Sequence, residues 1–241
     1  MKLLALETST EACSVAVWID GEVRERFELA PRRHAELALP WAEQLLAEAG
    51  IAKSQLDAIA VGRGPGAFTG VRLAIAIAQG IALALDRPVL PVSTLAALAF
   101  PFPRAREEGA RRADQGPILA AIDARMGEVY LGAFARDGDD LVALNEEVVV
   151  KPDVAVVPAG DSWHGVGTGF AAADGALQTR LYGRLGLVDA SALPHAADVA
   201  RLGALAYARG EAIAPERIKP AYLRNKVALT SAEQQALRAS R

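Results

Sequence analysis

Residues 61–72 read VGRGPGAFTGVR and join a short apolar run, residues 56–61, to a long apolar helical pattern, residues 73–85. Four glycines and one proline in this stretch predict a backbone held in turns that other residues adopt only at a cost. Phe68 places a large apolar side chain in the middle of the loop. The stretch therefore predicts a loop of one defined shape between a strand and a helix, and such loops commonly position functional groups.

Composition limits the classes of protein that the chain can represent. Its 241 residues are 52% hydrophobic and 23% charged, which suffices for a sizeable core and allows one large domain or two small ones. The net charge of -3 gives no general attraction to nucleic acid, and a single cysteine, Cys13, fits a reducing compartment. The apolar run over residues 1–6 is too short for a signal peptide, and residues 71–85 fall short of a membrane span. We therefore expect a cytoplasmic globular protein.

The first hundred residues show the pattern of a β-meander followed by alternating helices and strands. Three apolar runs predict strands over residues 3–6, 13–19 and 22–29. Helical spacing predicts a helix over residues 34–49, in which Pro40 either introduces a kink or marks the true start. The remaining elements are a strand over 56–61, a helix over 69–85, a strand over 89–92 and a helix from Ser93 to about residue 99. This order predicts an α/β fold.

The second half begins after a proline-rich and charged stretch, residues 101–117, which is the best candidate for a domain boundary. Strands are predicted over residues 118–122, 127–134 and 141–150, and helices over 171–185 and 196–208. Both halves thus begin with an apolar run, a short turn and a second apolar run. A duplicated architecture is therefore plausible, although the two sequences do not repeat.

Metal and nucleophile chemistry have little support in the pattern. The histidines His34, His164 and His195 do not show the i, i+4 spacing that places two imidazoles on one helix face. Cys13 lies inside a predicted strand, where a buried and inert thiol is the common case, and no G-x-S-x-G turn occurs. We therefore expect neither a metal site nor a hydrolase nucleophile.

Phosphate binding has somewhat more support, from two turns. Thr8, Ser9 and Thr10 form a hydroxyl-rich turn after the first predicted strand, and residues 165–169 form a glycine-rich turn in the second half. Neither turn carries the lysine of a Walker loop. Contact with a nucleotide and an ordinary hydroxyl-rich hairpin turn therefore both remain open for residues 8–10.

The helical pattern over residues 71–85 is apolar almost all round, with Arg72 and Gln79 as its strongly polar residues. A surface helix needs only one apolar stripe. Two interpretations fit equally well: a central helix buried on every side, or a helix with one face that binds a partner, where alanines and Gly80 would allow close approach.

Four segments, in order along nearly the whole chain, carry a family resemblance. They are LETST with CSVA (residues 6–10 and 13–16), GRGPGAFTGVR (62–72), DARMGEVY (123–130) and YLR (222–224). On these segments the chain resembles the TsaB family, also called YeaZ, which is a bacterial relative of the TsaD/Kae1 proteins. The G-P-G-x-F-T-G-x-R loop is the specific motif, and Ala67 stands where the family usually has serine.

The resemblance implies the actin-like ATPase fold (ASKHA, ribonuclease H-like), an α/β fold with two βββαβα lobes. Residues 1–100 would form the N-terminal lobe with the partner-binding helices. Residues 101–241 would form the second lobe with a C-terminal tail that packs back on the first. The loop residues would then have a structural role; they are Gly64, Pro65, Gly66, Phe68, Thr69 and Gly70.

The resemblance also implies a function: a non-catalytic scaffold for threonylcarbamoyl transfer to the adenosine beside the anticodon of tRNAs that read codons starting with A. Such a protein binds and activates TsaD, and the nucleotide-dependent TsaE joins the complex. It has no intrinsic cofactor, contacts ATP or ADP within the complex, reaches tRNA through the complex and forms a homodimer when alone. Residues 93–97 read STLAA where TsaD carries its first metal-binding histidine pair, which implies that the usual catalytic centre is absent.

The resemblance places the partner interface on the first two helices of the N-terminal lobe. Helical spacing selects Leu37, Trp41, Leu45, Arg72 and Ile75 for it. Two other classes remain open. One is an independent small-molecule kinase of the actin-like fold, with Glu7 and Asp123 as its placed acidic residues. The other is a glycoprotease, which is disfavoured because the metal-binding histidine pair is missing.

Overall fold

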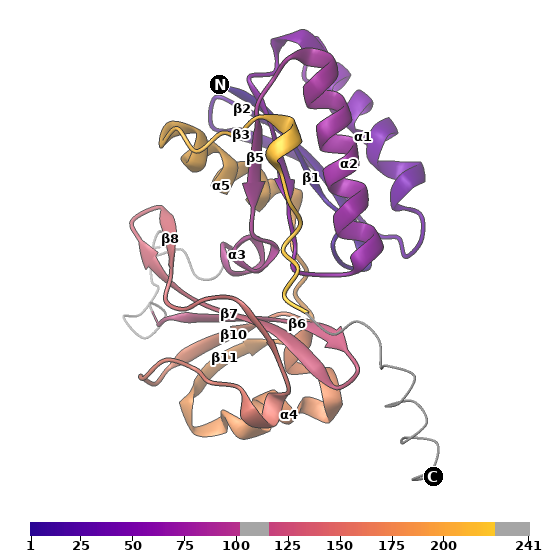
Figure 1. Ribbon diagram of the computed structural model, residues 1–241. Helices are drawn as coiled ribbons and strands as arrows, with labels where there is room; N and C mark the ends of the chain where they lie inside the picture. The colour runs from indigo at the N-terminus through magenta and orange to yellow at the C-terminus, as the bar shows by residue number, and fades with distance from the viewer. Residues whose placement is uncertain (102–115, 225–241) are drawn as a thin grey trace.

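The computed structural model describes residues 1–101 and 116–224. These residues form two lobes, each built around one β-sheet, with the second lobe below the first in Figure 1. The first sheet has five strands in the order β3-β2-β1-β4-β5, and the second has six, in the order β11-β10-β6-β7-β8 with β9 paired to β7. The predicted α/β class and the two-lobed organisation are therefore confirmed.

The first sheet combines an antiparallel meander with two parallel strands. Its strands are β1 (Lys2–Glu7), β2 (Ala12–Ile19), β3 (Glu22–Leu29), β4 (Ala58–Gly62) and β5 (Val89–Val92). Side chains of β1 alternate between two cores, with Leu4 and Leu6 on one face and Leu3 and Ala5 on the other. Because helices cover both faces, β1 reads as a continuous apolar run, which is why it could be recognised from sequence.

Two helices cover one face of the first sheet, α1 (His34–Glu48) and α2 (Phe68–Leu85). They stand side by side to the right of the sheet in Figure 1. Pro40 lies inside α1, which begins at His34, so this proline does not mark the start of the helix. The short helices η1 (Lys53–Gln55) and α3 (Thr94–Ala99) complete this half, and the Ser93 hydroxyl caps α3 by accepting the Ala96 N–H, as predicted.

The second sheet contains strands that the sequence pattern did not show. Its strands are β6 (Ile118–Arg125), β7 (Glu128–Asp137), β8 (Asp140–Ala143), β9 (Val148–Val150), β10 (Trp163–Val166) and β11 (Leu185–Asp189). The single strand expected over residues 141–150 is thus two short strands, β8 and β9. Its helical pieces are α4 (Ala172–Arg180), η3 (Pro152–Val154), η4 (Thr168–Phe170) and η5 (Tyr182–Arg184).

The helix expected over residues 171–185 is shorter and broken. Ala173, Asp174 and Gly175 have positive φ angles, so the regular part of α4 lies after them and ends at Arg180. The apolar residues beyond Arg180 belong to η5 and β11 instead. Apolar spacing alone did not separate a helix from this succession of short elements, because each contributes only a few residues.

The expected division into residues 1–100 and 101–241 needs a correction, because α5 (Ala196–Ala208) packs on the first sheet. It contacts β1, β2 and β4. A Cβ at Gly203 would lie 2.8 Å from the Ala60 Cβ, so the glycine lets helix and strand approach closely. After α5, Ile213 pairs with Val89 of β5, and the turn η6 (Pro215–Arg217) follows beside α2. Of the expected linker, residues 102–115 lie outside the described part, as does the tail from 225 onward.

The burial of α2 decides whether this helix is buried on every side, a question that its sequence left open. Its buried residues are Gly70, Val71, Ala74, Ile75, Ala78 and Ala82. Arg72, Ala76, Gly80 and Leu83 face outward, so the helix is not buried on every side. With 18 residues and high hydropathy, α2 is the one helix of the described part that is long and apolar enough to cross a membrane. This test also selects core helices of soluble proteins, and a third of the tested window is buried against the first sheet.

Candidate functional site

The glycine-rich loop lies directly on the turn that follows β1. A Cβ added at Gly66 would fall 2.4 Å from the Ser9 carbonyl oxygen, and one added at Gly70 would fall 1.9 Å from the Thr8 carbonyl oxygen. The Ala67 N–H donates to the Ser9 carbonyl at 2.7 Å. Only glycine allows this contact between two backbones, which explains why the loop has glycine at positions 66 and 70.

The two segments enclose a polar cluster around Glu7, at the end of β1. The Glu7 carboxylate accepts the Ser9 N–H at 2.6 Å and the Thr94 hydroxyl at 2.9 Å. Thr94 also accepts the Gly64 N–H at 3.2 Å. Burial raises the pKa of Glu7 above its ordinary value, although these hydrogen bonds act in the opposite direction. Glu7, an acidic candidate for a kinase, is therefore sealed inside the first lobe.

The three residues proposed for nucleotide contact lie in this same buried region. Thr8, Ser9 and Thr10 are at most 7% exposed. The Thr8 hydroxyl donates to the Gly70 carbonyl at 2.7 Å, and the Ser9 hydroxyl pairs with that of Thr94 at 3.1 Å. The Thr10 hydroxyl accepts the Ala12 N–H at 3.3 Å. All three hydroxyls therefore already have partners within the chain.

The second glycine-rich turn, residues 165–169, also serves packing. A Cβ at Gly165 would lie 2.7 Å from the Phe170 ring, and one at Gly167 would lie 2.3 Å from the Ala121 carbonyl oxygen. The Thr168 hydroxyl accepts the Asp123 N–H at 3.2 Å. The turn thus joins β10 to β6 within the second lobe, and its glycines are explained by these close approaches.

A cavity of about 840 Å³ opens between the lobes, and we call it the interlobe cavity. Thr10, Arg32 and Phe68 line it from the first lobe. Asp123 and Arg125 line it from the β6–β7 hairpin of the second lobe. Asp123 pairs with Arg125 at 2.9 Å, so the second acidic candidate for a kinase is already engaged by a cation.

Residues 218–224, here called the interlobe segment, pass from the first lobe to the second (Figure 1), and residues 221–224 line the cavity. The Ala221 N–H donates to the Arg63 carbonyl at 2.8 Å in the first lobe. Arg224 donates to the Ala124 carbonyl at 3.0 Å and to the Glu128 carboxylate at 2.6 Å in the second. The YLR motif therefore connects the two lobes.

Arg72 belongs to this connection. Its Nε donates to the Tyr222 hydroxyl at 2.6 Å, and its guanidinium carbon lies 3.6 Å from the centroid of the Phe68 ring. The Phe68 and Tyr222 rings are themselves 6.3 Å apart. Three residues from two motifs, the glycine-rich loop and YLR, thus form one cluster at the edge of the interlobe cavity.

The residues selected for the partner interface divide into two groups. Leu45 and Ile75 are 2% and 6% exposed and belong to the core between helices and sheet, which excludes them from a surface in this conformation. Leu37 and Trp41 are half-buried against the same core, and Arg72 is exposed. Helical spacing identified the apolar stripe correctly, but that stripe faces the sheet.

The outward face of α2 is the one on which the alanines and Gly80 were expected to allow close approach, but of its residues only Arg72 was selected for the interface. This face consists of Arg72, Ala76, Gly80, Leu83 and Ala84, and Leu83 is 63% exposed. A Cβ at Gly80 would meet nothing within 4 Å. Small residues recur every four positions at 76, 80 and 84, but also at 74, 78 and 82 on the buried side, so their spacing alone did not show which side faces outward.

The histidines lie in different environments. The His34 Nε2 is 3.1 Å from the Thr10 carbonyl oxygen, whereas His164 is buried in β10. Among residues 1–101 and 116–224, no three or more histidine, cysteine, aspartate or glutamate side chains gather as metal ligands would. His195 lies at the start of α5 and has an acidic partner.

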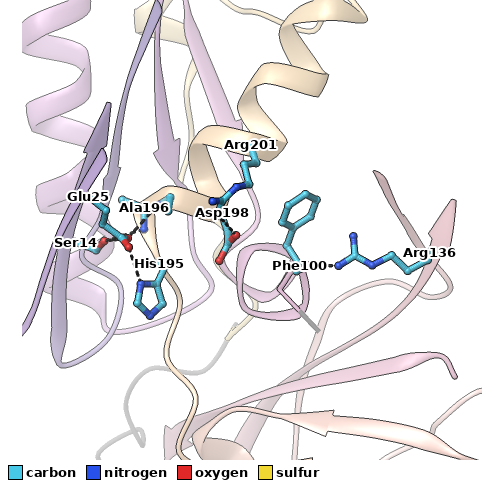
Figure 2. A network of polar contacts seen from close by, with 9 residues as sticks. Ser14, Glu25, Phe100, Arg136, His195, Ala196, Asp198 and Arg201 are labelled. Atoms are coloured by element: carbon cyan, nitrogen blue, oxygen red, sulfur yellow. Dashed lines mark hydrogen bonds and ion pairs between the residues drawn. The ribbon is translucent and has the colours of Figure 1, made fainter. Parts of the chain in front are cut away.

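That partner is Glu25 on β3, and Ser14 on β2 completes the cluster shown in Figure 2. Ser14 donates to Glu25 at 2.6 Å rather than to the histidine, and it accepts the Ala196 N–H at 2.8 Å. Ser14 is fully buried. The group therefore lacks the serine–histidine contact of a hydrolase and instead fixes the start of α5 on the first sheet.

Comparison with known proteins shows which proteins this chain is similar to. A sequence model described as "TsaD: tRNA N6-adenosine threonylcarbamoyltransferase" matches residues 27–232. The Escherichia coli K12 protein named "tRNA threonylcarbamoyladenosine biosynthesis protein TsaB" is 42% identical over 233 residues, which cover 95% of this chain and 96% of the relative. A Chlorobaculum tepidum protein named "tRNA N6-adenosine threonylcarbamoyltransferase" is 33% identical over 152 residues, 57% of this chain and 42% of the relative.

The solved structures include a protein with the same architecture. The structure titled "YeaZ from Pseudomonas aeruginosa" superimposes with a TM-score of 0.80 at 45% identity, covering 92% of this chain and 99% of the other.

Proposed function

Because this chain belongs to the TsaB (YeaZ) family and so takes part in tRNA threonylcarbamoyladenosine biosynthesis, we propose that it acts there as a non-catalytic subunit that binds and activates a TsaD-type transferase. Its two-lobed α/β architecture is of the actin-like type. The observation that carries the proposal is the outward face of α2, which exposes apolar surface that packing among residues 1–101 and 116–224 leaves uncovered.

The shape of that face suits another helix. Ala76, Gly80 and Ala84 are spaced four residues apart, so they lie in one row along α2. Their side chains are small, so the helix surface is low along this row. Leu83 stands beside this row with 63% of its surface exposed. A partner helix can approach closely along such a row and cover Leu83, which removes apolar surface from water.

The inner residues support a non-catalytic role. Thr94 lies in the STLAA segment, where the resemblance places the first histidine pair of TsaD, and its hydroxyl is bonded to Glu7. Glu7 is buried and Asp123 is paired with Arg125, so both acidic residues considered for a kinase are engaged inside the chain. We therefore favour the accessory subunit over both the independent kinase and the glycoprotease.

The remaining parts of the proposal follow from the family. The nucleotide-dependent TsaE would join the complex, ATP or ADP would be contacted within the assembled complex, and tRNA would be reached through it. Without TsaD, the outward face of α2 would support a homodimer, since an exposed apolar face can also cover a second copy of itself. We expect the protein to work in the cytoplasm, where tRNA is modified.

The sharpest test uses glycines that have open space around them. Gly80→Glu adds a charged side chain to the middle of the outward face of α2 without meeting any atom of the chain within 4 Å of its Cβ. Gly183→Glu is the matched control, because Gly183 also has open space but lies in the second lobe. Binding to TsaD from the same organism would be measured by calorimetry with both variants.

We expect Gly80→Glu to weaken TsaD binding at least tenfold and Gly183→Glu to leave it unchanged. Reconstituted modification of tRNA, read by nucleoside mass spectrometry, should fall with Gly80→Glu and persist with the control. Unchanged TsaD binding by Gly80→Glu would exclude this face as the interface. Equal modification with and without the chain would contradict the accessory role itself.

A further inference from the structure

The interlobe cavity has a charge opposite to that of the whole chain. Four arginines and two carboxylates line it, whereas the chain carries a net charge of -3. The carboxylate of Asp123 pairs with Arg125, and Arg224 pairs with Glu128. Arg32, Arg72 and the carboxylate of Glu11, which also lines the cavity, form no ion pair among the described residues, so one positive charge is left in excess at the cavity. An anionic ligand fits this local excess.

The same edge of the cavity exposes aromatic rings. Phe68 and Tyr222 are 55% and 54% exposed, and their ring centroids are 6.3 Å apart. Arg72 holds the pair in place through the Phe68 ring at 3.6 Å and the Tyr222 hydroxyl at 2.6 Å. Two exposed rings fixed beside an arginine form a surface on which a planar base can stack.

Arginines also extend from both lobes toward this edge. Arg32 precedes α1 in the first lobe, and Arg125 lies at the β6–β7 turn with 81% of its side chain exposed. Both line the interlobe cavity, as do Phe68 and Tyr222. Positive groups on two sides of a stacking surface match a ligand that carries a planar base between phosphates.

We propose that Phe68, Arg72 and Tyr222, with Arg32 and Arg125 beside them, bind an unpaired nucleotide of RNA at the edge of the interlobe cavity. The RNA class rests on the proposed function, in which the protein serves tRNA modification. The contact is local, because the acidic chain as a whole does not attract a phosphate backbone.

A free nucleotide has the same base and phosphate as a nucleotide of RNA. The inner part of the cavity suits it less well than the edge suits RNA. The hydroxyls of Thr8 and Ser9, which could otherwise bind phosphate oxygens, are bonded to Gly70 and Thr94. Asp123, a carboxylate that lines the cavity, is paired with Arg125. The exposed rings of Phe68 and Tyr222 lie at the edge instead, where a polymer can pass from one phosphate contact to the next.

The test is a fluorescence anisotropy titration of the full chain with a labelled RNA hairpin that has an unpaired loop. A fully paired RNA duplex of the same length and free ATP serve as competitors. Tyr222→Ala removes a stacking ring, whereas Tyr222→Phe keeps the ring and removes the hydroxyl that binds Arg72. Arg32→Ala removes a phosphate contact, and Arg33→Ala is its matched control, because Arg33 pairs with Glu28 and does not line the cavity.

We expect Tyr222→Ala to weaken hairpin binding by roughly 5- to 100-fold and Tyr222→Phe to keep most of it. Arg32→Ala should weaken binding and lower the salt slope by about one, whereas Arg33→Ala should change neither. The duplex and ATP should compete poorly. Thermal unfolding of each variant identifies loss of fold, and Arg32→Ala stays informative in any case because Arg32 is exposed and has no ion pair among the described residues.

Hairpin binding that Tyr222→Ala and Arg32→Ala leave unchanged would overturn the inference. So would ATP displacing the hairpin at equal concentration, since the site would then be one for free nucleotides. TsaD binding, measured on the same variants, keeps the two proposals apart. If TsaD binding persists while RNA binding is absent, this inference fails and the proposed function stands. If Gly80→Glu leaves TsaD binding intact while the RNA variants behave as expected, the proposed interface fails instead.

Discussion

The carboxylate of Glu147, from the second lobe, accepts a hydrogen bond from the hydroxyl of Ser93, from the first. The second oxygen of Glu147 lies 3.8 Å from the Arg63 guanidinium, which also belongs to the first lobe. Ser93 caps α3, the helix that packs between the two sheets. One half-buried carboxylate thus joins the glycine-rich loop, the α3 cap and the second sheet.

Replacing Glu147 with glutamine should change how stability depends on pH. Burial raises the pKa of Glu147 above its ordinary value of 4.5, while the Ser93 hydrogen bond and Arg63 act in the opposite direction. The folded state therefore holds this proton more tightly than the unfolded state, and stability falls as the pH rises from 4.5 through the folded pKa. Glu147→Gln should remove this fall, as measured by urea unfolding across that range. An identical pH profile in wild type and variant would contradict the assignment.

The His195–Glu25 pair predicts a pH dependence near neutrality. The hydrogen bond that the His195 ring donates to Glu25 raises the pKa of His195, although burial acts against it, and Asp198 and Arg201 on α5 contribute with opposite signs. A histidine with a raised folded pKa adds stability that is complete below its ordinary value of 6.5 and is lost as pH rises through the folded pKa. We expect thermal unfolding of His195→Gln to lack this loss.

Glu25 gives the opposite dependence at acid pH. Burial alone would raise its pKa, but hydrogen bonds from His195, Ser14 and the Ala197 N–H together lower it. Stability from this carboxylate is therefore present above 4.5 and lost as pH falls through the folded pKa. Glu25→Gln should flatten the acid side of the unfolding profile, and a profile unchanged from that of wild type would contradict the lowered pKa of Glu25 in the folded state.

Two glycines of the same helix should respond to alanine in opposite ways. Gly70→Ala forces a Cβ to within 1.9 Å of the Thr8 carbonyl oxygen, so the loop or the β1 turn must shift. We expect a loss of stability of about 3 kcal/mol. Gly80→Ala meets nothing within 4 Å and should stabilise the helix by about 1 kcal/mol. Chemical denaturation of both variants checks the pair, and a tolerated Gly70→Ala would contradict the close packing of loop on hairpin.

Neighbouring residues of α2 should separate folding from partner binding. Ile75 is 6% exposed, so Ile75→Glu removes a core side chain and buries a charge, which should cost about 4 kcal/mol of stability. Ala76 faces outward, so Ala76→Glu should keep the fold and weaken TsaD binding. Unfolding curves and calorimetry on both variants test this. Full TsaD binding by Ala76→Glu would exclude the outward face of α2 at that position.

The sequence predicted the motifs that form the candidate site, but not the contacts between them. The loop from Gly62 to Arg72 and the YLR motif were recognised, yet their contact was not, because Arg72 and Tyr222 are 150 residues apart. The hydroxyls of residues 8–10 looked available for phosphate. Their engagement by Gly70 and Thr94 depends on how the loop and α3 pack on the hairpin, which no local pattern records.

The sequence by itself determined the elements whose signal is local. Strands β1 to β3, helices α1, α2 and α5, and the Ser93 cap follow from periodicity, turn residues and capping chemistry, which act over a few residues. Only the tertiary structure decided that α5 belongs to the first sheet, that Ile75 faces inward while Ala76 faces outward, and that Glu7 is sealed. These outcomes depend on which apolar faces cover one another across long separations, and burial of a face is a property of the assembled lobes rather than of any segment.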